Sequence, residues 1–97
     1  MSRALVEQRL TELSDRLRET RRELAIADEQ LASLSGDADE ARLRSLVSET
    51  PLAEQEHREA SRHAEAMARH RDSVLASIEQ MEQAQDDLLD RLIASTD

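Results

Sequence analysis

The chain has 97 residues, no Cys and no aromatic residue, and its 22 acidic and 13 basic side chains give a net charge of −9. Without Cys there is no disulfide or thiolate metal site, and without aromatic rings there is no stacking platform for nucleic-acid bases. The negative charge disfavours direct binding to nucleic acid or to an anionic membrane surface, so the expected partners are proteins.

The first predicted element is a helix over residues 2–35. From Arg3 onward, residues recur at alternating steps of three and four, which is the heptad spacing of a helix that packs against another helix. This seam contains Val6, Leu10, Leu13, Leu17, Thr20, Leu24, Ala27, Leu31 and Leu34. Gly36 follows, and because Gly readily adopts the left-handed conformation that closes a helix, we predict a helix end at Ser35.

Residues 36–50 form the predicted connection. Ala41, Leu43, Leu46 and Val47 have the spacing of a short helix of about three turns. We expect this short helix to fold over the end of the two long helices. Asp37 can cap it, with Glu40 completing a capping box.

The second long helix is predicted over residues 51–94. Thr50 is a suitable cap, and Pro51 suits the first turn because that amide has no intrahelical partner. The second seam contains Ala53, His57, Ala60, Ala64, Met67, Arg71, Val74, Ile78, Met81, Gln85, Leu88 and Leu92. Arg71 and Gln85 in this seam, together with Thr20 of the first seam, are expected to cost stability and to fix the register or the pairing.

The two seams predict an all-α fold, an antiparallel coiled-coil helical hairpin that forms a single domain over residues 1–97. Folding back at residues 36–50 places Leu34 near Ala53, Leu31 near His57, Leu10 near Ile78 and Val6 near Met81. In that register the first helix extends along the second only as far as Met81. The last turns of the second helix would therefore project beyond the first helix. An exposed apolar cluster is therefore expected at Leu88, Leu89, Leu92 and Ile93, and such a cluster usually marks an association surface.

A lone hairpin of this length buries few large apolar side chains. We therefore predict that two copies form a homodimeric four-helix bundle. The bundle would bury a second stripe on the hairpin, which includes Leu5, Ile26, Leu75 and Leu89.

The acidic connection contains Gly36, Asp37, Asp39 and Glu40. Gly36, Asp37 and Glu40 match Gly-Asp-x-x-Glu in the turn of the Gre family of transcript-cleavage factors, which this short segment resembles. The family's next residues differ, because Ala41 replaces Asn and Arg44 replaces Tyr. The resemblance implies carboxylates at the end of a helical hairpin that reach into bacterial RNA polymerase and help to coordinate a metal.

The sequence contains few motifs that are typical of catalytic, metal-binding or phosphate-binding sites. Glu54 and His57 have the Glu-x-x-His spacing of di-iron helical bundles, but this motif occurs once, where such sites need several ligands. A metal-storage bundle is therefore only a third hypothesis, and we predict no metal and no other cofactor. A single Gly cannot make a phosphate-binding loop, and no sheltered nucleophile and base are apparent, so we predict no enzyme activity.

The sequence thus predicts a small non-enzymatic scaffold or adaptor that is cytoplasmic and homodimeric. The alternative is a transcription regulator that resembles Gre-type factors and touches polymerase with an acidic tip. No stretch approaches the roughly 18 consecutive apolar residues of a membrane span. The expected contact residues are Asp37, Asp39, Glu40, Leu88, Leu89, Leu92 and Ile93.

Overall fold

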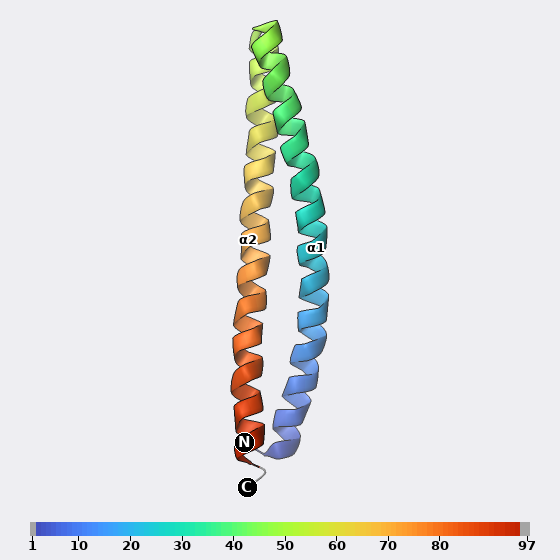
Figure 1. Cartoon of the computed structure of the whole chain (residues 1–97), viewed down its shortest axis with the longest axis vertical. Coiled ribbons are helices and arrows are strands. Elements are labelled where there is room, and N and C mark those ends of the chain that lie inside the picture. The colour runs from blue at the N-terminus through green and yellow to red at the C-terminus, as the bar shows by residue number, and fades with distance from the viewer. Residues whose placement is uncertain (1, 96–97) are drawn as a thin grey trace. The chain divides into compact units, whose positions relative to one another are not determined.

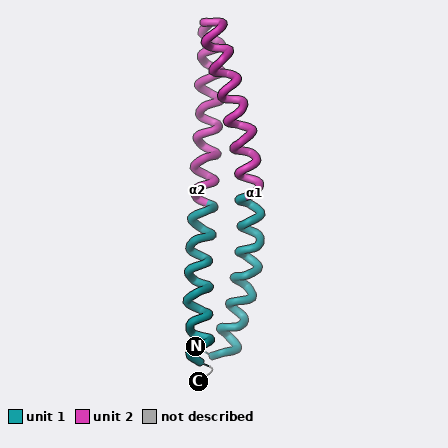
Figure 2. Tube along the Cα trace, in the orientation of Figure 1, with its two compact units in different colours: residues 1–24, 74–97 teal, residues 25–73 magenta. Residues whose placement is uncertain are grey.

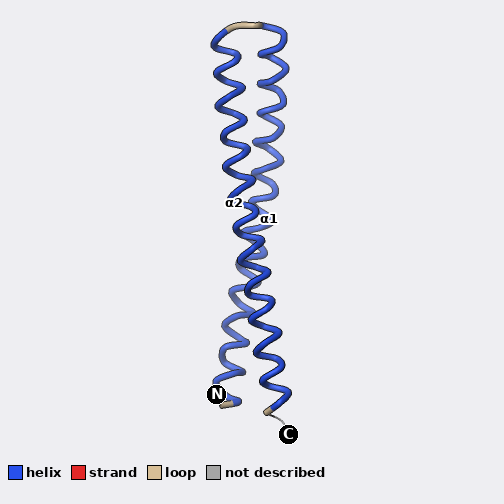
Figure 3. Tube along the Cα trace, turned by 90° about the vertical axis from the view of Figure 1, so that its left-hand side faces the viewer, coloured by secondary structure: helices blue, strands red, loops and turns tan. Residues whose placement is uncertain are grey.

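The computed structural model describes residues 2–95 and contains two long helices packed together as a hairpin (Figure 1). Helix α1 spans Arg3–Ser48 and helix α2 spans Pro51–Ala94. A short loop at Glu49 and Thr50 joins them (Figure 3). The predicted all-α hairpin is confirmed. Between residues 2 and 95, neither helix combines the length and apolar character that crossing a membrane requires.

Hydroxyl side chains cap both helices at their starts. The amide of Leu5 donates to Oγ of Ser2 at 3.2 Å, and the amide of Ala53 donates to Oγ1 of Thr50 at 3.1 Å. Such a cap satisfies one of the amides that the first turn leaves without an intrahelical partner. The predicted Thr50 cap is confirmed, and α2 begins at Pro51.

The predicted helix end at Ser35 and the separate short helix within residues 36–50 are wrong. Helix α1 continues through Gly36 to Ser48. Gly36 does not adopt the left-handed conformation, whereas Glu49 does, with φ of 48°. The amide of Glu49 donates to the carbonyl of Ser45 at 3.1 Å. Glu49 is therefore the left-handed residue that closes α1.

The physical reason for the longer helix lies in the seam. After Leu34 the steps of four and three continue through Ala38, Ala41 and Ser45. Ala41 is buried, and Ala38 and Ser45 are half-buried. A Gly inside a helix costs only about 1 kcal/mol relative to Ala, which three further turns of packed helix can outweigh.

The hairpin divides into two compact units (Figure 2). Unit 1 comprises Met1–Leu24 and Val74–Asp97, and unit 2 comprises Ala25–Ser73 with the loop. In each unit, a segment of α1 packs against an antiparallel segment of α2.

The core of unit 1 is built from large apolar side chains. Leu17, Val74 and Ile78 are buried in one cluster, and Leu24 and Met81 pack against it. The predicted register, with Leu10 near Ile78 and Val6 near Met81, is therefore wrong. The bend at Glu49 places the start of α1 beside the end of α2, where Val6 and Ala94 line the same shallow groove.

The core of unit 2 is built mainly from small side chains. Its buried residues are Ala27, Ala41 and Ala53. Nε of Arg71 donates to Oδ1 of Asp28 at 2.8 Å, and this contact raises the pKa of Arg71 above its ordinary value. The contact fixes the register, because it links position 28 of α1 to position 71 of α2.

In that register, Leu31 comes level with Met67, and Leu34 comes level with Ala64. The predicted neighbours of these leucines, His57 and Ala53, lie closer to the loop.

Candidate functional site

Four large apolar side chains are exposed around the loop of unit 2. Leu43, Leu46, Val47 and Leu52 are between 63% and 85% exposed. Three lie in the last two turns of α1, and Leu52 lies in the first turn of α2. We call these four residues the apolar tip.

The heptad pattern explains why these side chains face outward. In this part of α1 the seam positions are occupied by Ala41 and Ser45, which face α2. Leu43 lies between these two positions and Leu46 and Val47 follow Ser45, so all three lie on the outer surface of the helix. On α2 the buried seam residue is Ala53, so its neighbour Leu52 also faces outward.

The grouping of these side chains is more informative than their exposure. Single exposed apolar residues are common on protein surfaces and need no explanation. Four around one loop form a patch, and such patches mark surfaces that contact other macromolecules. Burying one exposed Leu or Val side chain yields roughly 1.5–3 kcal/mol, so even part of this patch could anchor a partner.

Charged side chains of both signs surround the apolar tip. Arg42, Arg44, Glu49 and Glu54 are all exposed next to it. An apolar centre with a polar rim is the usual anatomy of a protein interface, in which the rim influences orientation more than affinity.

The acidic residues predicted to lie at the bend lie elsewhere. Asp37, Asp39 and Glu40 are exposed on the side of α1. Asp37 precedes the end of the helix by about three turns, roughly 16 Å. Because α1 is continuous there, Asp37 does not cap a separate helix. The structure therefore lacks the geometric premise of the resemblance, which places these carboxylates at the bend.

The predicted projecting cluster near the end of α2 separates into two pairs. Leu88 and Leu92 are half-buried seam residues, and Leu88 lines a groove with Leu13 of α1. Leu89 and Ile93 are exposed on the surface of α2. This part of α2 does not project beyond α1, because α1 begins beside it.

The residues of the metal hypothesis do not meet in a cluster. His57 is half-buried in the α2 seam, and Glu54 is exposed. Within residues 2–95, no group of three or more His, Asp or Glu side chains is arranged to hold a metal ion.

The prediction from sequence did not single out Leu43, Leu46 or Val47 as contact residues, because the short helix that contains them was expected to fold over the end of the hairpin. The signal that could have found it is the continuation of the α1 seam through Ala38, Ala41 and Ser45. That continuation moves the bend to Glu49 and turns the leucines outward. Comparison of the chain with protein-family models, with curated proteins and with solved structures finds no match.

Proposed function

We propose that this chain is a small non-enzymatic coiled-coil scaffold or adaptor, and that its apolar tip is the contact for a protein partner. The observation that carries the proposal is the grouping of Leu43, Leu46, Val47 and Leu52, all largely exposed, around one loop. The capped helices and their buried seams then serve to hold this patch in place.

The spacing of the tip residues suggests how the partner is bound. Leu43, Leu46 and Val47 follow the i, i+3, i+4 pattern of helices that insert an apolar face into a groove of another protein. The partner is accordingly a folded protein with an apolar groove. A patch of this size makes a small interface, so we expect micromolar rather than nanomolar affinity.

Two hydroxyl groups on α1 donate to carbonyl groups of their own helix, which supports a non-enzymatic role for these two residues. Ser45 Oγ donates to the carbonyl of Arg42 at 2.7 Å, and Thr20 Oγ1 donates to the carbonyl of Arg16 at 2.8 Å. A hydroxyl that donates to its own helix backbone has no base to activate it as a nucleophile. The rival proposal, a polymerase factor with an acidic tip, has no comparable support, because Asp37, Asp39 and Glu40 lie on the side of α1.

Site-specific photo-crosslinking in the native cell tests the proposal. A photoreactive residue at Leu46 should form an adduct with a protein partner, whereas the same residue at Glu29, an exposed position farther along α1, should not. The adduct should disappear when Leu43 and Val47 are replaced by Ser. Equal adducts at both positions, or none at Leu46, would contradict a tip contact.

Binding to the purified partner gives the quantitative test. Leu46→Ser should weaken binding about tenfold, because one apolar anchor is lost. Ser33→Ala, a neutral change on the same helix outside the tip, should leave affinity unchanged. Circular dichroism should show equal helicity for all variants, since the substituted side chains are exposed.

A further inference from the structure

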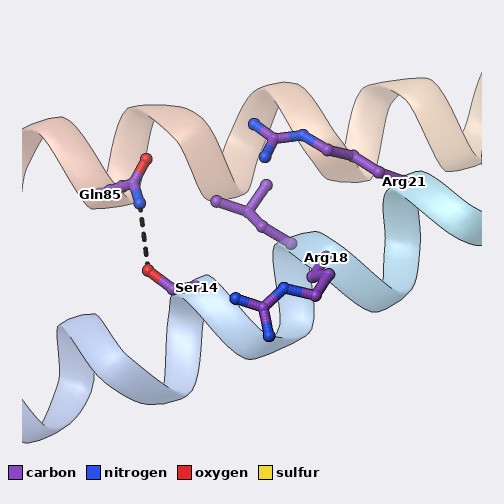
Figure 4. A pocket seen from close by; sticks show the side chains of 5 residues that line it. Ser14, Arg18, Arg21 and Gln85 are labelled. Atoms are coloured by element: carbon purple, nitrogen blue, oxygen red, sulfur yellow. Dashed lines mark hydrogen bonds between the residues drawn. The ribbon is translucent and has the colours of Figure 1, made fainter.

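A shallow groove of about 310 Å³ lies between the two helices of unit 1 (Figure 4). Arginine side chains line much of it, and Gln85 Nε2 donates to Oγ of Ser14 across it at 3.4 Å. Its lining residues are Ser14, Leu17, Arg18, Arg21 and Gln85. A groove of this kind can accept carboxylates.

The ion pair between Arg21 and Glu82 identifies the residues of α2 that share this face. Nη2 of Arg21 lies 3.4 Å from Oε2 of Glu82. Leu75 and Leu89 are one heptad before and after Glu82, so they lie on the same side of α2. Leu89 is 42% exposed and Leu75 is half-buried.

Beside the groove, the charged residues of the two helices differ in sign. On α1 the charged residues that line the groove are Arg18 and Arg21. Glu7 and Asp28 lie on the same side of α1 farther from the groove, and each is paired with an arginine. On α2, acidic residues lie one turn from Leu75 and Leu89. The acidic stripe on α2 consists of Glu79, Glu82 and Asp86. We call the surface formed by Arg18 and Arg21, this acidic stripe, and Leu75 and Leu89 the segregated face.

We propose that a second copy of this chain packs on the segregated face, with α1 of each copy against α2 of the other. A two-fold axis parallel to the helices produces this arrangement. Because Arg21 and Glu82 are already level within one chain, the axis brings the arginines of one copy level with the acidic stripe of the other. Glu79 and Asp86 then approach the arginine-lined groove, and Leu75 and Leu89 become covered.

The charges also select against the other symmetric packing. A two-fold axis perpendicular to the helices would place each acidic stripe against itself, and like charges across an interface are repulsive. Burial of the leucines contributes most of the affinity, while the charges choose the orientation. This dimer differs from the predicted bundle, since Leu5 and Ile26 occupy heptad positions on the opposite side from the Leu75 and Leu89 stripe.

Sedimentation equilibrium of the full chain and its charge variants tests the proposal. The wild-type chain should form a dimer whose affinity falls as salt is added. Arg18→Glu should weaken the dimer about tenfold, because each copy then presents a carboxylate to the partner's acidic stripe. Arg22→Glu is the matched control, since Arg22 pairs with Glu19 three residues away, as Arg18 pairs with Asp15, but lies outside the segregated face.

A mixing experiment shows whether the effect acts between chains. The Glu79→Arg, Asp86→Arg double variant should also dimerise weakly by itself. Mixed with Arg18→Glu, it should form a heterodimer at least as stable as the wild-type dimer, because both contacts between the chains become complementary. A monomeric wild-type chain at tens of micromolar, equal weakening by Arg22→Glu, or no gain on mixing would overturn the proposal. All these variants retain the apolar tip, so partner binding there is tested separately.

Discussion

At the scale of single residues, the backbone conformation of Glu49 determines where α1 ends. It is the one residue other than Gly between positions 2 and 95 with a positive φ. The left-handed conformation brings Cβ close to the following carbonyl oxygen and costs a side chain about 1 kcal/mol or more. Glu49 adopts this conformation because α1 must end there for α2 to begin at Pro51.

Glu49→Gly should therefore stabilise the hairpin. Removing Cβ relieves the strain, and after the greater flexibility of unfolded Gly is subtracted, the free energy of unfolding should rise by up to about 1 kcal/mol. Urea denaturation followed by circular dichroism measures it. Glu29→Gly, in the middle of α1, is the control and should lower stability by about 1 kcal/mol. A loss of stability in Glu49→Gly would show that the bend has another geometry.

At the scale of the helices, seam residues stabilise the hairpin, whereas residues on the outer surface are proposed to contact a partner. Leu17 is 1% exposed in the core of unit 1, whereas Leu46 belongs to the exposed apolar tip. Replacing Leu17 by Ala should therefore destabilise the fold. Replacing Leu46 by Ala should leave the fold intact and weaken binding of the partner.

Leu17→Ala should lower the free energy of unfolding by about 2–5 kcal/mol, because it leaves a cavity in a packed core. Leu46→Ala should change it by less than about 0.5 kcal/mol, since the side chain is already in water. Thermal and urea denaturation of the two variants give the comparison. Similar losses at both positions would mean that Leu46 is packed and the tip does not exist.

The polar seam residue Gln85 illustrates the cost of fixing a register. Its side-chain Nε2 donates to Oγ of Ser14 at 3.4 Å, which is long for a hydrogen bond. A Leu at this position would instead pack between the helices. Gln85→Leu should raise the free energy of unfolding by about 1 kcal/mol while making the helix register less specific. Denaturation measures the first effect. Cross-linking of Cys pairs placed in neighbouring registers measures the second, and an unchanged single pairing would contradict a registering role.

At the scale of the whole molecule, the two units differ in how their cores are filled. Unit 1 buries Leu, Val and Ile, whereas the buried residues of unit 2 are alanines. Less apolar area is removed from water in unit 2, so its local opening should cost less free energy.

Hydrogen exchange measured by mass spectrometry should show this difference. Amides in residues 38–47 and 54–63 should exchange at least tenfold faster than those in residues 10–23 and 75–88. Equal protection in both sets would indicate that the hairpin opens as one cooperative unit despite its uneven core.

The extent to which sequence predicted this fold follows from the strength of each local signal. Leucine-rich heptads marked both helices, and Thr50 with Pro51 marked the start of α2. The bend was misplaced because Gly36 is a strong helix-ending signal, whereas Ala38, Ala41 and Ser45 continue the seam with small residues that carry little hydrophobic contrast. The predicted exposed contacts at Leu88 and Leu92 depended on that bend. These two seam residues are instead half-buried beside α1, and the apolar tip lies where a covering helix had been expected.

The free energy of unfolding of Gly36→Ala tests the central claim, that α1 passes unbroken through Gly36 and turns the apolar tip outward at Glu49. A Cβ at Gly36 would meet no atom within 4 Å. Ala in a continuous helix should raise the free energy of unfolding by about 0.5–1 kcal/mol. A decrease of about 1 kcal/mol or more would show that Gly36 is a left-handed helix end and that the chain bends there.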